Sequence, residues 1–149
     1  MGIGELAIRQ VVVGSRETSV LDAAKLMRQY HVGDIVITDE ADGKRLPVGI
    51  VTDRDIVLEV FAQGIDATKL TVGDIMTGDL LTVKEYEGVF QTIQLMRAKG
   101  ARRAPVVDKD GALLGIISAD DFIELLAEEL SELARLVSRE QKREAEIRQ

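Results

Sequence analysis

The sequence predicts a mixed α/β (α+β) fold: one strand, helix, strand, strand, helix (βαββα) unit occurs twice and is followed by an extended C-terminal helix. Three observations predict it. The passage Gly-Ile-Val-Thr-Asp-Arg-Asp-Ile at 49–56 returns at 115–122 as Gly-Ile-Ile-Ser-Ala-Asp-Asp-Phe. With an offset of 69 positions, residues 13–39 also match residues 82–108. Finally, 149 residues with 46% hydrophobic content suit one shared core, whereas a unit of about sixty residues would be marginal alone.

Each unit is predicted to begin with a strand and a helix. The runs at 11–13 and 80–83 are apolar and rich in β-branched residues or leucine, which favours strands. In the first unit Ser19 and Asp22 have the spacing of a capping box, and apolar residues follow at helical spacing. In the second unit the same spacing is kept by Val89, Ile93 and Met96.

Two short strands joined by a polar turn are predicted to follow each opening helix. Gly100 is expected to end the second helix in the left-handed conformation, and the offset puts His31 at the equivalent place in the first. The strands are predicted, in chain order, at 35–38, 48–51, 105–107 and 114–117.

The boundaries of the two repeats follow from a change in composition. A polar, glycine-containing connector ends near residue 70, and a short capped segment at 71–77 opens the second unit. We therefore predict repeat 1, with its N-terminal segment and connector, at 1–70 and repeat 2 at 71–137. Residues 138–149 are mostly charged with both signs mixed, which predicts a solvated helix end or a disordered tail.

The last helix is predicted to be long. From Ala119 to the end there is no Gly or Pro, so one helix is expected to cover most of about 30 residues. Its apolar stripe has spacings of three and four and consists of Phe122, Leu126, Leu130, Leu133 and Val137. A stripe on such a helix favours a role in assembly.

Composition excludes several classes of function. A net charge of −7 and the absence of a basic stripe argue against a nucleic-acid surface, and no apolar run is long enough to span a bilayer. Without cysteine or an N-terminal leader, the expectation is a cytoplasmic protein without disulfides. One histidine and no phosphate-loop motif leave no recognisable catalytic or metal constellation, so we predict that the chain is not an enzyme.

Four motifs in a fixed order carry a family resemblance. They stand at 49–56, at 71–77 (Thr-Val-Gly-Asp-Ile-Met-Thr), at 104–108 (Ala-Pro-Val-Val-Asp) and at 115–122. Together they resemble tandem CBS domains, named after cystathionine β-synthase, over roughly residues 3–137. The resemblance implies a stand-alone Bateman module, in which two repeats are related by a pseudo-twofold axis and the clefts between them bind adenosine-type ligands.

The chemistry of such a ligand suits the repeated passage. An ionised Asp accepts hydrogen bonds from both ribose hydroxyls, while a hydroxyl residue and the amides of a helix start can meet a phosphate. Asp55 lies three positions after Thr52, and Asp121 three after Ser118, so each helix start offers both kinds of group. The family pattern gives the two Asp the ribose role and Thr52 and Ser118 the hydroxyl position.

The resemblance also assigns phosphate and adenine contacts, and here the two repeats differ. It implies that Arg102 and Arg103 reach phosphates and that backbone near Ala104 and Pro105 meets the adenine. The first repeat has Gly-Asp-Ile-Val at 33–36 in the equivalent place, an acid where the second repeat has arginines. Arg54 partly restores the balance in the first repeat, and Asp120 stands close to the equivalent position in the second. We expect two clefts of unequal affinity.

Plainer interpretations stay open for the same residues. A hydroxyl residue followed three later by Asp is also a helix cap that needs no ligand. Arg97 and Lys99 can be explained by a helix C-terminus, where cations are favoured, and His31 by a structural or solvent-exposed role.

Two functional hypotheses follow. The first is a regulatory sensor that binds AMP, ADP or ATP and transmits occupancy to its own assembly or to an unidentified regulated protein, with S-adenosylmethionine or NAD(H) as variant ligands. The second is a ligand-free structural module for dimerisation or docking. In either case the resemblance implies a homodimer.

Overall fold

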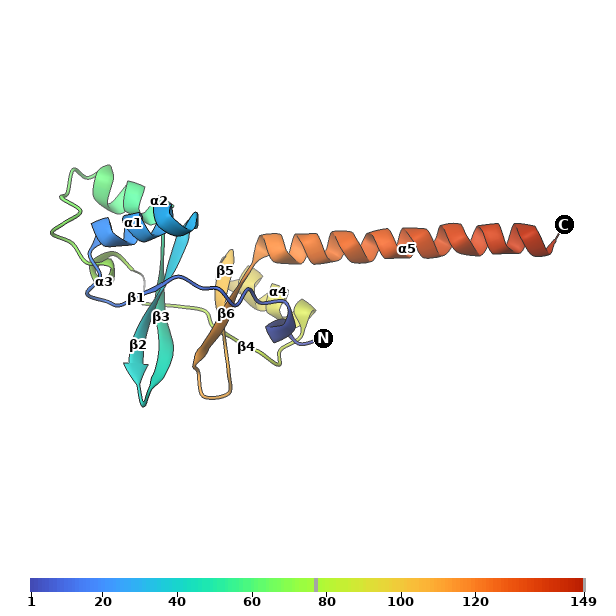
Figure 1. Ribbon diagram of the computed structural model, residues 1–149, viewed down its shortest axis with the longest axis horizontal. Helices are drawn as coiled ribbons and strands as arrows, with labels where there is room; N and C mark the ends of the chain where they lie inside the picture. Colours follow the sequence, from blue (N-terminus) through green and yellow to red (C-terminus); the bar gives the residue numbers. More distant parts are fainter. Residues whose placement is uncertain (77, 149) are drawn as a thin grey trace. The chain divides into compact units, whose positions relative to one another are not determined.

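The computed structural model describes residues 1–76 and 78–148, which form two compact units, Met1–Ile117 and Ser118–Gln149 (Figure 1). Thr77 and Gln149, the last residues of the segments predicted at 71–77 and 138–149, lie outside the described residues. In the described part of the chain the first unit carries two three-stranded sheets, and the second unit is one long helix. The predicted mixed α/β fold with a C-terminal helix is confirmed.

The first sheet and its helices follow the predicted order. The elements are β1 (Val13–Gly14), α1 (Val20–Tyr30), β2 (Asp34–Ala41), β3 (Lys44–Thr52) and α2 (Asp53–Ile56), which continues as a π-helix, η2 (Val57–Phe61). β1 pairs with β2 in parallel, and β2 pairs with β3 antiparallel with a shift in register after Ile37.

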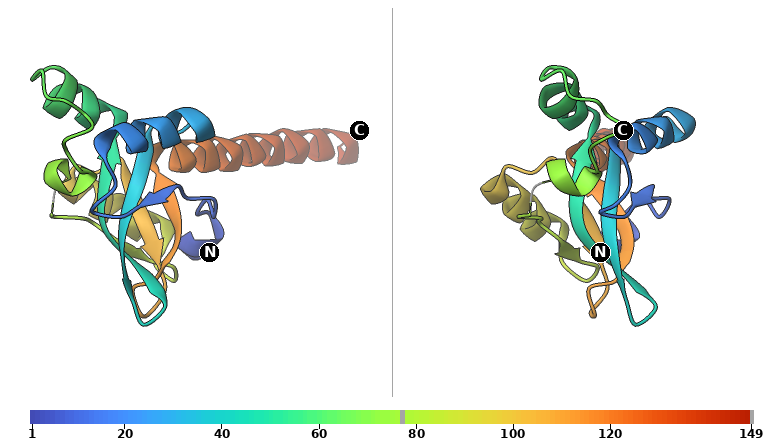
Figure 2. Two further views of the ribbon diagram at one scale, coloured as in Figure 1. Left: turned by 60° about the vertical axis from the view of Figure 1, so that its left-hand side comes forward. Right: turned by 90° about the vertical axis from the view of Figure 1, so that its left-hand side faces the viewer.

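The second sheet repeats the first. Its elements are α3 (Val72–Ile75), β4 (Val83–Lys84), α4 (Val89–Lys99), β5 (Arg103–Val107) and β6 (Leu113–Ser118), in the strand order β4-β5-β6. Figure 2 shows the two sheets of this unit from two further directions. Val83 pairs with Val106 in β5 as Gly14 pairs with Ile37 in β2, so the 69-residue offset also relates the ladders.

The strands that precede the opening helices are shorter than predicted. The runs 11–13 and 80–83 were expected as strands, but pairing begins only at Val13 and Val83 and lasts two residues. Each of these strands has a single, parallel neighbour at the edge of its sheet, so the apolar run ahead of it extends beyond the paired ladder.

The predicted helix ends are confirmed. The Oγ of Ser19 accepts a hydrogen bond from the backbone N–H of Asp22 at 3.0 Å, which caps α1. His31 ends α1 with φ of 55°, and Gly100 ends α4 with φ of 68°. Both positions are left-handed, which glycine adopts freely and histidine does not.

The leading segment of each repeat packs against the other repeat. The 3-10 helix η1 (Ile3–Glu5) precedes repeat 1, and α3 is its equivalent in repeat 2. Four backbone N–H groups, two from each segment, donate across, from Ile3 to Glu87 (2.8 Å), Gly4 to Glu85 (2.8 Å), Val72 to Thr18 (2.8 Å) and Gly73 to Arg16 (3.0 Å). The second pair of bonds repeats the first with an offset of 69 at both ends. This reciprocal exchange ties the repeats together with approximate twofold symmetry.

The exchange also reaches the core. Val72, from the leading segment of repeat 2, is fully buried in a cluster with Ala23, Ile35, Ile37 and Val51 of repeat 1. Ile3, its equivalent at the start of the chain, is likewise fully buried. A single repeat would therefore lack part of its own hydrophobic core.

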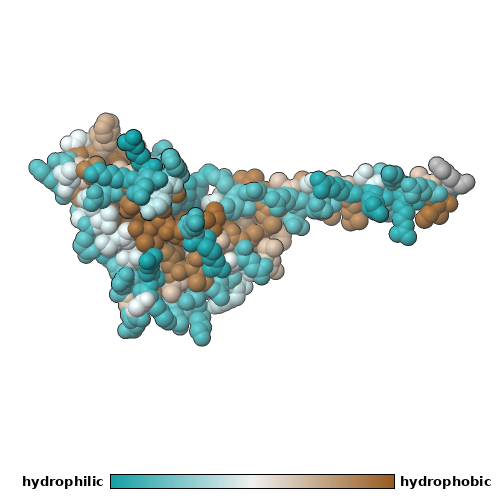
Figure 3. All heavy atoms as spheres, viewed as in Figure 1, coloured by the Kyte–Doolittle hydropathy of each residue, from teal (hydrophilic) through white to brown (hydrophobic). Residues whose placement is uncertain are grey.

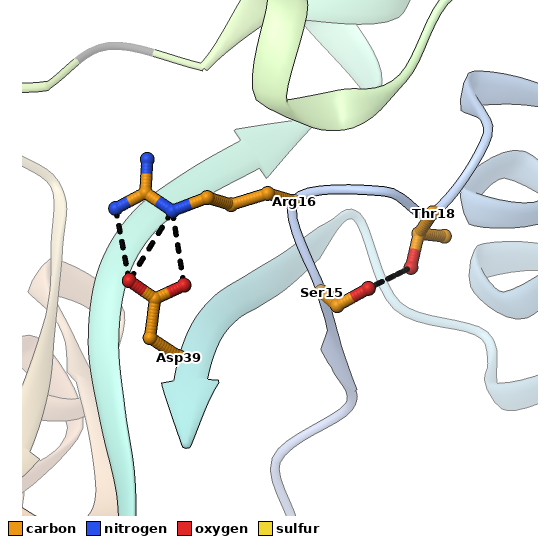
Figure 4. A network of polar contacts seen from close by, with 4 residues as sticks. All are labelled: Ser15, Arg16, Thr18 and Asp39. Atoms are coloured by element: carbon orange, nitrogen blue, oxygen red, sulfur yellow. Dashed lines mark hydrogen bonds and ion pairs between the residues drawn. The ribbon is translucent and has the colours of Figure 1, made fainter. Parts of the chain in front are cut away.

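A polar contact holds the turn that receives the second exchanged segment. Arg16 binds both carboxylate oxygens of Asp39 in β2, with its Nε 2.9 Å from Oδ1 (Figure 4). The same arginine lowers the pKa of Asp39, mainly through this hydrogen bond. The backbone N–H of Ser15 donates to Thr18 Oγ1 at 3.0 Å, and Figure 4 shows the two hydroxyls facing each other. The carbonyls of Arg16 and Thr18 are thereby fixed where Gly73 and Val72 donate to them.

The second unit is the helix α5 (Ala119–Ile147), capped by Ser118. It is continuous through the charged segment after Val137, so residues 138–147 of this tail are helical. Among the described residues no helix has the length and apolar character needed to cross a membrane.

Candidate functional site

A cavity of about 680 Å³ in the first unit collects most of the residues singled out in repeat 1 and two of those in repeat 2. Three segments line it: the junction of β3 and α2, residues 79–81, and the turn from α4 into β5. The lining side chains that carry charge or a hydroxyl are Thr52, Asp53, Arg54, Asp79, Lys99, Arg102 and Arg103. Ile50, Leu80 and Leu81 supply apolar surface. The combination suits a ligand with a flat apolar part and an anionic part.

Cations outnumber acids on the wall of this cavity. Arg54 and Arg102 are exposed, and Lys99 donates to Asp79 Oδ2 at 2.7 Å. The sequence explains Lys99 by its position at a helix C-terminus, where cations are favoured. The structure shows that Lys99 also lines the cavity, which helical spacing could not indicate.

Arg103 makes an ion pair with the first repeat. Its Nε lies 2.7 Å from Asp34 Oδ2, and the exposed fractions of the two side chains are 36% and 19%. Burial raises the pKa of Asp34; Arg103 opposes this effect and the neighbouring Asp53 adds to it. The acid that distinguishes the first repeat thus lies against the arginine that distinguishes the second.

The start of α2 is locked by short contacts. Thr52 Oγ1 accepts the N–H of Asp55 at 3.1 Å, and Asp55 Oδ2 accepts the N–H of Thr52 at 2.9 Å, a reciprocal capping box. Asp53 N–H donates to the carbonyl of Gly33 at 2.9 Å, which joins this helix start to the residue before β2. Thr52 is one of the residues that line the cavity, and Asp55 is not.

Ser118, Asp120 and Asp121 belong to the second unit and form the start of α5. Asp121 Oδ2 accepts the backbone N–H of Ser118 at 2.8 Å and its hydroxyl at 3.0 Å, while Ser118 Oγ accepts the N–H of Asp121 at 3.3 Å. Asp120 is exposed in the first turn. The capping interpretation therefore holds at both helix starts, and the ribose role of the two Asp remains a prediction.

Ala104 and Pro105 have buried side chains in β5. Any contact from them to a ligand has to come from the backbone, as the resemblance implies. No group of three or more His, Cys, Asp or Glu side chains within 1–76 and 78–148 is arranged to hold a metal ion.

Sequence reasoning missed the two acids on the cavity wall, Asp53 and Asp79, and the partner of Arg103. The repeated passage gives no signal for Asp53, because repeat 2 has Ala119 in the matching place, and Asp79 lies outside the four motifs. The signal for the ion pair was present, since position 34 plus the offset of 69 gives position 103. Equivalent positions that lie near a twofold axis meet each other, and opposite charges there can pair.

Comparisons with known proteins agree with this architecture. A sequence model of the family described as CBS domain matches residues 3–62 and 72–128. An uncharacterised protein of Methanopyrus kandleri is 37% identical over 125 residues, which are 84% of this chain and 62% of that protein, so the chain spans less than two thirds of its relative.

Two solved structures are similar to the chain over most of its length. The CBS domain pair of protein MJ0100, in complex with 5′-methylthioadenosine and S-adenosyl-L-methionine, has a TM-score of 0.74 and 26% identity, covering 87% of this chain and 98% of that one. The CBS domain protein PAE2072 from Pyrobaculum aerophilum, complexed with AMP, has a TM-score of 0.71 and 28% identity, covering 81% and 89%. With two family matches over most of its length, the chain belongs to the CBS domain family.

Proposed function

We propose that the chain is a regulatory module that binds an adenosine nucleotide, AMP, ADP or ATP, in the cavity between β3–α2 and α4–β5. The observation that carries this proposal is the gathering of Arg54, Lys99, Arg102 and Arg103 on one cavity wall in a chain of net charge −7. An acidic protein repels anions over most of its surface, so a local group of cations favours a phosphate-bearing ligand.

The division of roles follows from charge. The arginines meet the phosphates, and the Thr52 hydroxyl adds a neutral hydrogen bond next to them. Asp55 Oδ2 is engaged in the cap, so we assign the ribose hydroxyls to its other carboxylate oxygen. Because Asp55 does not line the cavity itself, this role requires the ribose to extend beyond the lining residue Thr52. We assign Asp121 the corresponding ribose role in the second repeat, and backbone near Ala104 and Pro105 the adenine contact. The proposal contains no catalytic step.

The structural relatives support an adenosine ligand and leave its form open. One was solved with AMP, the other with S-adenosyl-L-methionine and 5′-methylthioadenosine. S-Adenosylmethionine offers a single carboxylate beside its positive sulfonium and ammonium groups, and 5′-methylthioadenosine has no anionic group, so both make less use of a wall rich in arginine than a phosphate chain does. The cations on this cavity favour AMP, ADP or ATP over S-adenosylmethionine, with NAD(H) as a longer variant.

Regulation requires that the ligand bind one arrangement of the protein more tightly than another. The Arg103–Asp34 pair provides a place for that difference, because phosphate competes with Asp34 for the same guanidinium. We propose that the chain acts as a homodimer and that occupancy changes either its assembly or its contact with an unidentified regulated protein.

A ligand panel tests the proposal. Thermal unfolding is followed with adenosine, AMP, ADP, ATP, NAD, 5′-methylthioadenosine and S-adenosylmethionine, and dissociation constants are then measured by calorimetry. A ligand at 100 times its Kd stabilises the native state by about 2.7 kcal/mol, which is several degrees for a chain of this size. No shift with any adenosine compound at millimolar concentration would rule the proposal out.

Variants of the cavity identify the phosphate contacts. Arg102→Met should weaken ATP more than AMP and leave adenosine almost unchanged, because the lost charge acts on phosphates. Arg28→Met, on the exposed face of α1, removes the same charge away from the cavity and serves as the control. Equal losses for adenosine and ATP in Arg102→Met would contradict the assignment.

The second candidate is a structural module without a ligand. One observation favours it: the two capping boxes and the Arg103–Asp34 pair already satisfy several proposed ligand contacts from within the protein. Under this hypothesis the Arg102→Met and Arg28→Met proteins behave alike with every compound of the panel.

A further inference from the structure

The helix α5 presents an apolar stripe that the described residues leave exposed. Its 29 residues extend about 44 Å at 1.5 Å per residue. Figure 3 shows hydrophobic side chains recurring between hydrophilic ones along this helix. The exposed apolar side chains with a three-four spacing are Ile123, Leu126, Leu130, Leu133 and Val137, with Leu130 exposed to 68%; Leu136, next to this stripe, is also exposed.

This spacing is that of a coiled-coil seam. Ile123, Leu130 and Val137 occupy one core position of the heptad, and Leu126 and Leu133 occupy the other. The stripe therefore fits a partner helix with the same repeat. After Val137 the seam meets Glu140 and Glu144, so the apolar part spans two heptads.

The charges of α5 are divided along its length. From residue 119 to 132 the charged side chains are all acidic, namely Asp120, Asp121, Glu124, Glu128, Glu129 and Glu132. From 135 to 143 four of the five charged side chains are basic, namely Arg135, Arg139, Lys142 and Arg143, with Glu140 as the exception. The first half of the helix thus carries negative charge, and the second half carries mainly positive charge.

This division selects both the partner and its direction. A second copy laid parallel would set acid beside acid over the whole first half. Laid antiparallel, the acidic half of each copy faces the basic half of the other, which lowers the electrostatic energy of the pair. The ion pair between Arg135 and Glu132 within one helix, at 3.2 Å, is exposed and weak, so it competes little with attraction to a second copy.

We propose that α5 pairs antiparallel with α5 of a second copy of this chain. The register that centres the stripe puts Leu126 opposite Val137 of the second copy and Leu130 opposite Leu133, while Ile123 at each end faces Glu140. In the same register Glu124 and Glu128 lie at the levels of Arg139 and Arg135 of the second copy. These side chains project from the outer faces of the two helices, so the opposite halves attract through their summed charge and not through ion pairs across the seam. The contact is self-complementary about a twofold axis near residues 131 and 132, as a closed dimer requires.

The first experiment measures mass as a function of concentration by analytical ultracentrifugation of the full chain. Two heptads make a small interface, so dimerisation should depend on concentration. Leu130→Glu places one buried charge in each of the two central layers of the dimer, opposite Leu133 of the other copy. It should raise the dissociation constant at least tenfold. Ser131→Glu adds the same charge one residue away, off the seam, and should leave the constant within about twofold.

The second experiment tests direction, using the absence of cysteine from the chain. Antiparallel pairing predicts that Leu126→Cys alone and Val137→Cys alone form little disulfide dimer, because like positions lie eleven residues apart. A mixture of the two single variants should form the mixed disulfide readily. Efficient self-crosslinking of each single variant would show parallel pairing and overturn the proposal.

Two further outcomes also decide the matter. A wild-type chain that stays monomeric at 100 μM overturns the proposal, and so does a dimer that Leu130→Glu leaves intact, since the contact then lies elsewhere. Nucleotide binding is read separately by calorimetry and should survive Leu130→Glu, so failure of self-pairing and failure of the proposed ligand site are distinguishable.

Discussion

Asp34 and Arg103 occupy equivalent positions of the two repeats and form an ion pair of 2.7 Å with each other. Each stands first in the middle strand of its sheet, β2 or β5. The pseudo-twofold relation that makes them equivalent also brings them together. The position at which the two repeats differ in charge therefore forms an ion pair between the repeats, and this pair holds Arg103 at the cavity wall.

Replacing Arg103 should lower the stability of the protein more than replacing Asp34. Arg103→Met is expected to lower the free energy of unfolding by about 1.5 kcal/mol, less than for a fully buried pair because the arginine is partly exposed. It leaves the carboxylate of Asp34 half-buried beside Asp53. Asp34→Asn should cost about 0.5 kcal/mol, because the remaining guanidinium can turn to water. Urea unfolding of both variants at neutral pH checks the order.

The same pair predicts a dependence on pH. The pKa of Asp34 is raised above 3.8 by burial, so the native state holds this proton more tightly than the unfolded state. The stability linked to protonation of Asp34 is therefore fully present below the pKa of the unfolded state, and it is lost as pH rises through the higher pKa of the native state. Without Arg103 the pKa rises further. The deficit of Arg103→Met should be full at pH 7 and should shrink toward pH 4; an equal deficit at both would contradict the assignment.

Capping and ligand binding at α2 can be separated by two substitutions. Thr52→Ala removes the acceptor of the Asp55 N–H and should lower stability by about 1 kcal/mol without any ligand. Asp55→Asn retains an oxygen that can accept the N–H of Thr52, so stability should fall by less, while affinity for every ribose-containing compound drops. Chemical unfolding and calorimetry read the two effects. Unchanged affinity in Asp55→Asn would leave the cap as the whole role.

Gly73 is required by the exchange of leading segments. A Cβ at this position would lie 2.8 Å from the carbonyl oxygen of Arg16, and the backbone would have to shift. Gly73→Ala should therefore cost about 2 kcal/mol, as overpacking does. Gly4→Ala, at the equivalent position, should behave similarly because its Cβ would meet Glu85 at 2.9 Å. Thermal unfolding of the two variants compares them.

Gly88 provides the contrast. It is the N-cap of α4, at the position equivalent to Ser19, and a Cβ there would meet nothing within 4 Å. Gly88→Ser should stabilise the protein by about 0.3 kcal/mol, because its hydroxyl can accept a backbone N–H as that of Ser19 does. A loss here as large as in Gly73→Ala would mean that the glycine effects are not due to close contact.

The two helix ends allow a reciprocal exchange. His31→Gly relieves a left-handed residue and should stabilise by about 1 kcal/mol, since the histidine is exposed and loses no packing. Gly100→Ala imposes the strain and should cost about as much. Two changes of the same sign in the unfolding temperature would refute the backbone explanation.

Much of this protein could be predicted because its signals are local. Capping residues and apolar spacing fixed α1, α4 and α5 closely, and the hairpin strands only lengthened in the structure. The runs at 11–13 and 80–83 failed as full strands because strand length depends on the neighbour available for pairing, here one parallel edge. Propensity describes the chain alone, whereas a ladder needs a partner.

The candidate site divided along the same line. Thr52, Arg54, Arg102 and Arg103 were identified from the sequence and line one cavity. Lys99 and Asp79 became part of it only through the path of the chain between α3 and β5. Their place on the cavity wall could not be predicted from residue type, because Lys and Asp occur equally in exposed ion pairs, such as the one that these two residues form.

The sequence by itself determined the duplicated unit, its family and the difference between the repeats, because repeated motifs and changes of charge can be read along the chain. Only the tertiary structure decided where that difference acts. The twofold relation lies in no single stretch of residues; it arises when η1 and α3 exchange places between the repeats and share one core. That packing makes position 34 the neighbour of position 103 and turns an acid and an arginine, separately suited to repel and attract phosphate, into one ion pair at the cavity wall.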